Sequence, residues 1–161
     1  GIMAGCSTRS LGLTRLMPSA GAQALVLGGT LSAVAGVAHL ACIALGPPAY
    51  RFLGAGERMA RAVEAGKTKP SLVTLAIATV LLLWALYAFS GAGLVGQLPF
   101  TGPVLAAISL VYLARALGFP LLKPMFPENS TTFWLVSSGI CLVLGSLYAI
   151  GAITVWLESG A

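Results

Sequence analysis

Four long apolar stretches dominate this sequence and decide what it can fold into. They run over about residues 22–46, 71–93, 102–122 and 132–157, and each holds the ~20 residues that a helix needs to cross a bilayer core. The runs are continuous, whereas the strands of a membrane barrel alternate apolar and polar residues. A helix also satisfies its own backbone groups in lipid. The sequence therefore predicts an all-α integral membrane protein, a four-transmembrane-helix bundle that forms a single domain over residues 1–161.

The composition agrees with a membrane location. Of the 161 residues, 58% are hydrophobic and only 8% are charged, which is more apolar surface than a soluble domain of this size can bury. The formal net charge of +5 would suggest nucleic acid in a soluble protein. Here the basic residues stand in short segments beside apolar runs, where an anionic lipid surface attracts them. We therefore expect the lipid bilayer as partner and no nucleic acid.

The segment between the first two apolar runs carries most of the charge. Its apolar stripe recurs at helical spacing and consists of Phe52, Gly56, Met59 and Val63. Charged residues occupy the other faces, and Glu57 and Arg61 are placed for an i,i+4 pair. This pattern predicts a short amphipathic interfacial helix over about residues 50–66, lying on the membrane surface. A solvated loop is the alternative.

The distribution of Lys and Arg predicts the orientation. The first and third connecting segments hold six of these residues, namely Arg51, Arg58, Arg61, Lys67, Lys69 and Lys123. The two tails and the second connection hold only Arg9 and Arg15. By the positive-inside rule the first and third connections are cytoplasmic and both termini are outside. The composition, rich in Ala, Gly and Leu, suggests a bacterial cytoplasmic (inner) membrane.

The two halves of the chain resemble each other. The first apolar run ends in HLACIALGPP and the third in YLARALGFP, while the second contains LWALYAFSGA and the fourth VLGSLYAIGA. A tandem repeat of two-helix units would place a pseudo-twofold axis along the membrane normal. The alternative is that apolar helices resemble one another by composition.

Small residues recur every four positions on two of the predicted helices. One ridge consists of Ala24, Gly28, Ser32 and Gly36, and the other of Ser137, Cys141, Gly145 and Ala149. Such ridges let helix backbones approach closely. We expect the first and fourth helices to pack through them. Contact between two protomers of a homo-oligomer, or with a partner in a membrane complex, is the alternative.

Two ionisable side chains, His39 and Arg115, fall inside the predicted spans. A charge inside hydrocarbon costs roughly 2.5 to 3.5 kcal/mol on insertion scales, so such residues are candidate site residues. At 1.5 Å per residue both lie ~10 to 12 Å from the cytoplasmic surface. Tyr112 precedes Arg115 by three positions and shares its face.

Two serines extend this candidate site. Ser137 and Ser138 lie ~9 Å from the same surface, so the sequence predicts a cytoplasm-facing polar pocket. Its ligand-binding residues would be His39, Tyr112, Arg115, Ser137 and Ser138, with Glu57 as a counter-ion to Arg115. The alternatives are that Arg115 extends its guanidinium to the headgroups and that His39 bonds to a serine hydroxyl or a backbone carbonyl. Glu57 would then pair along its own helix.

No catalytic or cofactor motif accompanies these residues. One histidine and three dispersed cysteines provide no metal site, and a Ser-His-acid triad would need an acid at membrane depth, where none occurs. The catalytic residues and the cofactors therefore stay unknown. Cys42 and Cys141 are interpreted as small buried apolar residues.

Three hypotheses about function remain open. The first is a small-molecule or lipid-binding protein, or a small transporter, whose cytoplasm-facing pocket holds an anionic or amphipathic molecule beside Arg115. The second is an accessory or scaffold subunit of a larger membrane complex. The third is a membrane enzyme that acts on a lipid or quinone, with His39 as general base.

Overall fold

The computed structural model describes residues 19–54, 56–125, 127 and 129–159, and every regular element in these ranges is a helix. The long helices are α2 (Ala20–Leu45), α5 (Lys69–Gly91), α6 (Thr101–Leu117) and α8 (Thr131–Ser159). The short ones are α3 (Pro47–Phe52), α4 (Glu57–Glu64), α7 (Phe119–Leu122) and the 3₁₀ helix η1 (Lys123–Met125).

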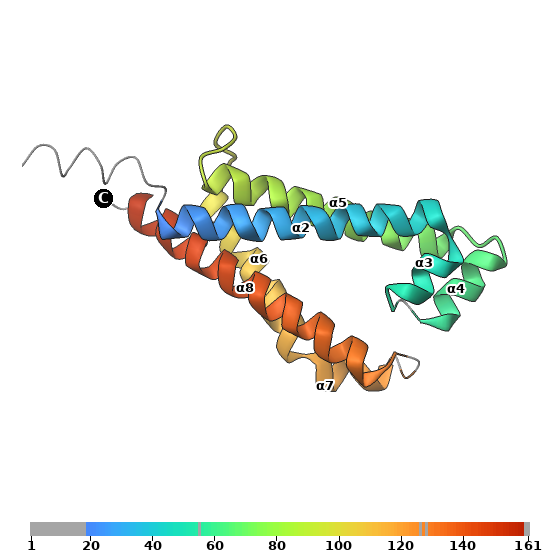
Figure 1. The fold of residues 1–161 in the computed structure, drawn as a ribbon. Coiled ribbons are helices and arrows are strands. Elements are labelled where there is room, and N and C mark those ends of the chain that lie inside the picture. Colours follow the sequence, from blue (N-terminus) through green and yellow to red (C-terminus); the bar gives the residue numbers. More distant parts are fainter. Residues whose placement is uncertain (1–18, 55, 126, 128, 160–161) are drawn as a thin grey trace, which may run out of the picture.

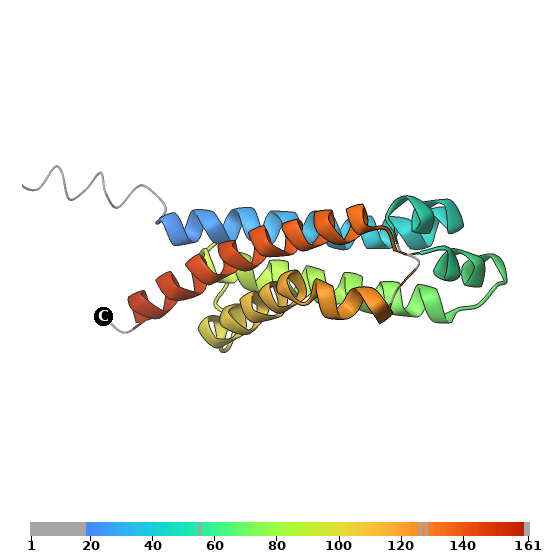
Figure 2. The same ribbon diagram turned by 90° about the horizontal axis from the view of Figure 1, so that it is seen from below.

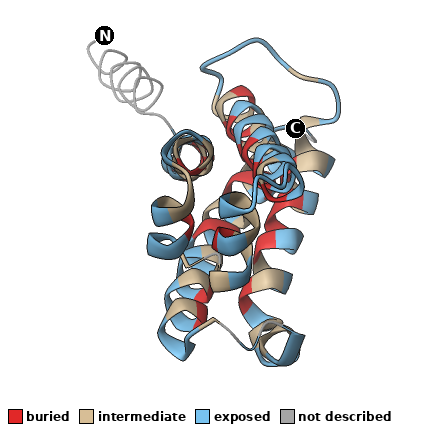
Figure 3. Ribbon diagram, turned by 90° about the vertical axis from the view of Figure 1, so that its right-hand side faces the viewer, coloured by how far each residue is buried: buried red, intermediate tan, exposed pale blue. Residues whose placement is uncertain are grey.

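Three of the long helices are long and apolar enough to cross a membrane by themselves. These are α2, α5 and α8, and their bounds agree within two residues with three of the four predicted spans. Their outward faces carry large exposed apolar side chains, such as Leu83, Val143 and Ile153, while buried positions line the faces where helices meet (Figure 3). Both features are consistent with a membrane protein.

The predicted continuous third helix over residues 102–122 is wrong. The helix α6 ends at Leu117, and α7 with η1 continues at an angle of 60°. Pro120 has no backbone N–H, and its ring conflicts with the preceding helical turn. Gly118 permits a close approach, because a Cβ atom there would lie 2.7 Å from the Ala114 carbonyl oxygen. The helix pair qualifies as a membrane span only when both parts are counted together.

The long helices form two hairpins. In one, α2 lies beside α5, and in the other α6 lies beside α8 (Figures 1 and 2). The hairpins pack together at the end of the molecule that holds the start of α2 and the end of α8. They diverge toward the other end, where α3 and α4 follow the first hairpin's α2 and α7 follows the second hairpin's α6 (Figure 1).

The predicted interfacial helix over residues 50–66 is two helices rather than one. A turn separates α3 from α4, with Gly54 at φ +76° and Gly56 at φ +90°, a backbone region that residues with a Cβ rarely adopt. The predicted Glu57–Arg61 ion pair is confirmed, at 3.1 Å. Tyr50 of α3 and Ala60 of α4 are buried with Cys42 of α2. Met59 and Val63 of the apolar stripe pack against this cluster instead of facing outward.

The first ridge of small residues is buried, as its pattern predicts, but its contacts agree with the prediction only in part. Gly28 lies against Tyr148 of α8, and Gly36 lies against Leu82 of α5. In the second ridge, Gly145 faces Leu113 of α6. The prediction that the first and fourth helices pack through these ridges is therefore confirmed in part: α2 and α8 lie against each other with Gly28 at their contact, but Gly36 faces α5 and Gly145 faces α6.

Candidate functional site

A chain of hydroxyl groups joins all four long helices where the hairpins pack together. The Ser32 hydroxyl lies 2.9 Å from the Tyr112 hydroxyl and 3.1 Å from the Tyr148 hydroxyl. The Tyr148 hydroxyl also lies 3.0 Å from the backbone carbonyl oxygen of Trp84. The Tyr148 hydroxyl is the donor in both contacts, so its single proton is directed toward the Trp84 carbonyl and the Ser32 hydroxyl. Between Ser32 and Tyr112, either hydroxyl can donate.

This arrangement fills the interior rather than lining a pocket. Ser32 and Tyr148 are fully buried. The Tyr112 ring packs edge-on against Trp84 at 4.9 Å and lies 5.7 Å from the Tyr148 ring. Tyr112 was predicted to lie in a pocket with Arg115. In the structure its hydroxyl instead bonds to Ser32 at the junction of the hairpins. Ser32, Trp84 and Tyr148 were not identified as site residues from the sequence.

Arg115 lies in the last turn of α6 and its guanidinium faces α8. Nη2 donates a hydrogen bond to Ser137 Oγ at 3.1 Å, and the guanidinium carbon lies 4.6 Å from the centroid of the Trp134 ring. The stacked ring and the hydroxyl fix the plane of the guanidinium. Nη1 is buried and has no hydrogen-bond partner. The predicted proximity of Arg115 and Ser137 is therefore present in the structure.

The start of α8 positions the partners of Arg115. The Ser130 hydroxyl accepts a hydrogen bond from the Phe133 N–H at 3.1 Å, which caps the helix. Trp134 and Ser137 follow one turn apart on the face toward α6. Ser138, also predicted, is buried, and its hydroxyl has no partner. Trp134 was missed, although its spacing of three from Ser137 was a signal that could have found it.

The other two predicted site residues lie elsewhere. His39 Nδ1 is 2.7 Å from the Ala35 carbonyl oxygen of its own helix, so this nitrogen carries the proton and the ring is satisfied locally. Glu57 accepts hydrogen bonds from Arg51 Nε at 2.9 Å and Arg61 Nε at 3.1 Å. Within the described ranges, no hydrogen bond or ion pair joins either residue to Arg115.

The carboxylates in the described part of the chain leave Arg115 without a counter-ion. Glu57 and Glu64 pair with Arg51 at 2.9 and 2.8 Å. Together the two arginines beside Glu57 lower the pKa of that carboxyl to about 2. Glu158 lies near the end of α8, at the other end of the helices from Arg115.

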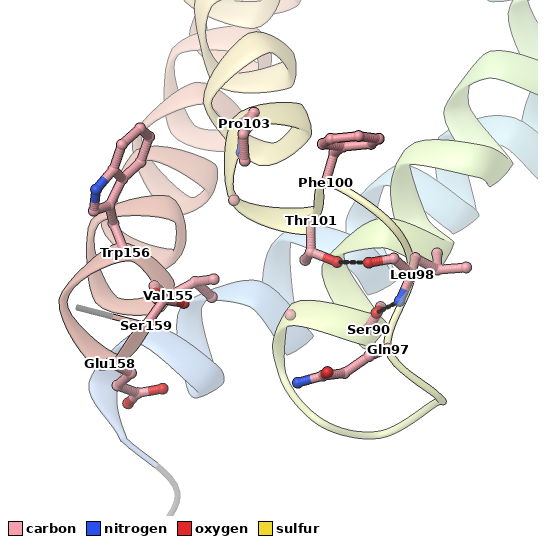
Figure 4. A pocket seen from close by; sticks show the side chains of 12 residues that line it. Ser90, Gln97, Leu98, Phe100, Thr101, Pro103, Val155, Trp156, Glu158 and Ser159 are labelled. Atoms are coloured by element: carbon pink, nitrogen blue, oxygen red, sulfur yellow. Dashed lines mark hydrogen bonds between the residues drawn. The ribbon is translucent and has the colours of Figure 1, made fainter. Parts of the chain in front are cut away.

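Two cavities lie at the end of the molecule opposite Arg115. The larger, about 620 Å³, lies between the α5–α6 connection and the end of α8, with Gln97, Phe100 and Glu158 in its wall (Figure 4). A smaller one of about 260 Å³ shares Ser90 and Glu158 with it. None of the six predicted site residues lines either cavity.

Comparison with known proteins adds no assignment. A scan of family models and searches of curated proteins and solved structures find no match to the chain. The candidate site therefore stands on its geometry: an arginine held by Trp134 and Ser137, with a buried donor that has no acceptor.

Proposed function

We propose that this chain is a membrane protein with four spans that binds an anionic group at Arg115. The observation that carries the proposal is the buried Nη1 of Arg115, which has no hydrogen-bond acceptor. A buried donor without an acceptor is costly, by about 1 to 3 kcal/mol and more for charged groups. An anionic ligand would supply both the acceptor and the charge that the described residues do not supply.

The guanidinium is prepared for such a ligand. Its planar fork matches a carboxylate or phosphate group with two parallel hydrogen bonds. Trp134 and Ser137 already hold this fork in one orientation, so a ligand would not have to order it. The Ser138 hydroxyl, buried and unpartnered on the next position of α8, is a candidate second donor.

The four spans would be α2, α5, α6 and α8, with α7 and η1 bent away from α6 by 60°. The 17 residues of α6 rise about 26 Å, slightly less than the ~30 Å of a hydrocarbon core. The last turn of α6, with Arg115, would then lie close to the headgroup layer. That depth favours a ligand with an anionic head and an apolar tail, and a lipid or other amphiphile fits this description.

The remaining features of the proposal come from the sequence pattern. The basic connections would be cytoplasmic, with both termini outside, in a bacterial inner membrane. The tandem repeat finds support in one detail. In each hairpin the first helix ends at a glycine, Gly46 or Gly118, and a short helix with proline in its first turn follows.

A second candidate function is an accessory subunit of a membrane complex. The junction of the hairpins favours it, because Ser32, Tyr112 and Tyr148 are buried there and their hydroxyls already bond to groups of the chain itself. Under this function Arg115 would meet an acidic group of a partner subunit instead of a small ligand. The hydrogen bond of the His39 ring to Ala35 of its own helix lends no support to an enzyme that uses His39 as base.

Thermal unfolding of the purified protein would test the proposal. The panel contains phosphatidylglycerol, a fatty acid, a quinone, glycerol phosphate and inorganic phosphate. A ligand that binds only the native state stabilises it by ~2.7 kcal/mol at about 100 times its Kd. We expect a raised midpoint with at least one anionic compound. A response to phosphatidylglycerol alone would identify a lipid, and a response to glycerol phosphate as well would identify the free headgroup.

Substitutions make this test specific to Arg115. Arg115→Gln should abolish the shift, and Arg115→Lys should reduce it, because lysine keeps the charge and loses the planar fork. Glu158→Gln is the control, since this exposed residue lies near the end of α8, away from Arg115 and from the basic connections, and it should respond as the wild type does. No shift with any compound, or an equal shift in Arg115→Gln, would leave the accessory subunit as the better reading.

A further inference from the structure

Positive charge is concentrated at one end of the molecule. Apart from Arg115, the described Lys and Arg residues at this end are Arg51, Arg58, Arg61, Lys67, Lys69 and Lys123, against the acids Glu57 and Glu64, a balance of six minus two, or +4. Beyond the junction of the hairpins, near the other end, the sole charged residue that the structure describes is Glu158. The basic end consists of α3, α4, α7 and η1 (Figure 1).

The packing of α3 against α4 pairs both acids with arginines and leaves the lysines without an ion pair within the described ranges. Arg51 binds both Glu57 and Glu64, at 2.9 and 2.8 Å. Lys67 and Lys69, which follow α4, are exposed and form no ion pair within the described ranges. The carboxylates are therefore neutralised within the chain, while the lysines keep their charge for a partner.

Exposed apolar side chains stand beside these cations in both hairpins. In α3, Phe52 is 90% exposed, next to Arg51. In α7 and η1, Leu121 is 81% and Met125 70% exposed, on either side of Lys123. Large apolar groups in a short basic helix are typical of segments that lie in a membrane interface. Each of these segments directly follows a long apolar helix, which is where a span leaves the hydrocarbon.

We propose that α3–α4 and α7–η1 are two lipid-binding segments that rest in an anionic headgroup layer. Phe52 and Leu121 enter the boundary with the acyl chains, and the lysines lie among the phosphates. Anionic phospholipid is favoured over an acidic protein, because the apolar groups would need a matching pocket on a protein but insert directly into lipid. The inference does not depend on a ligand at Arg115.

Spin labels on the full-length protein in vesicles would test this. Phe52→Cys and Leu121→Cys are labelled one at a time in a chain that carries Cys6→Ser, Cys42→Ser and Cys141→Ser. Accessibility to oxygen relative to a water-soluble nickel chelate reports the depth of the label. We expect this ratio to rise at both positions when phosphatidylglycerol is added to phosphatidylcholine vesicles. The rise should shrink in 1 M salt, where the screening length falls to about 3 Å.

Two controls locate the effect. Leu94→Cys carries a label at an exposed position in the α5–α6 connection, outside the basic end, and its ratio should not change with phosphatidylglycerol. Lys67→Gln with Lys69→Gln should remove the rise at Phe52 and preserve it at Leu121. Arg115→Gln should preserve both rises, so failure of the anion site and failure of this inference are separable. Labels at Phe52 and Leu121 that stay in water in both lipids would overturn the inference and point to an acidic protein partner.

Discussion

Gly145 shows how closely α6 and α8 approach each other at the scale of one residue. Its carbonyl oxygen accepts a hydrogen bond from Ser109 at 2.8 Å. A Cβ atom at this position would lie 2.8 Å from the Leu113 side chain and 3.2 Å from its backbone nitrogen. The absence of a side chain is therefore part of the helix contact, and the contact is sensitive to a single methyl group.

Gly145→Ala should accordingly destabilise the protein. Overpacking of this kind costs typically about 1 to 3 kcal/mol, measured as a lowered midpoint of thermal unfolding in detergent. Gly139→Ala is the matched control, because a Cβ at Gly139 meets nothing within 4 Å, and alanine raises helix propensity by about 0.8 to 1 kcal/mol. If both variants lose equal stability, helix contact at Gly145 is not the cause.

Residue patterns predicted part of the candidate site. Arg115 and Ser137 were paired correctly because their estimated depths in the spans are similar. Trp134 was missed, because it stands near the start of an apolar run, where an aromatic side chain is typical of the membrane interface and does not by itself indicate a site. The Tyr112 hydroxyl bonds to Ser32 of α2 instead of lying beside Arg115. Side chains three positions apart on a helix point in directions that differ by about 60°, so Tyr112 and Arg115 can face different neighbours. A sequence gives the face of a helix but not the neighbour that covers it.

At the scale of elements, the lengths of apolar runs predicted three helices and missed the break in the fourth. The run from Thr101 stays apolar through Phe119 and Leu122, so hydropathy alone continues the helix across Gly118 and Pro120. The two short helices α3 and α4 were read as one for a related reason. Their apolar spacing continues across a turn in which Gly54 and Gly56 have positive φ.

The contact between α3 and α4 should depend on pH through Glu57. The arginines beside it lower the pKa of this carboxyl from 4.5 to about 2. A carboxyl with a lower pKa in the folded state contributes stability above its unfolded pKa and loses it as the pH falls through the folded value. We therefore expect α4 to stay docked above pH 4.5 and to loosen progressively toward pH 2.

Hydrogen exchange of the α4 amides between pH 5 and pH 2 would measure this, after correction for the intrinsic exchange rate. In Glu57→Gln the pH-dependent step should be smaller and protection lower throughout, because the neutral amide cannot hold Arg51 and Arg61 as strongly. An unchanged profile in that variant would show that another group controls the docking of α4.

At the scale of the whole molecule, one buried chain of hydroxyls sets how the two hairpins meet. Tyr148→Phe removes the donor to the Trp84 carbonyl and to the Ser32 hydroxyl. Loss of a buried partner costs about 1 to 3 kcal/mol, so the unfolding midpoint should fall. Tyr87→Phe, at a half-buried tyrosine on α5, should change stability by less than about 0.5 kcal/mol. If the unfolding midpoint changes equally in both variants, the aromatic ring of Tyr148, rather than its hydroxyl, stabilises the contact between the hairpins.

The divergence of the hairpins away from their junction (Figure 1) gives the molecule a wedge-shaped outline. Set across a bilayer, a wedge displaces more lipid area in the leaflet at its broad end than in the leaflet at its narrow end. Such an inclusion bends the sheet around it and has lower elastic energy where the sheet is already bent in that direction. The broad end is also the basic end, so curvature and charge would favour the same leaflet.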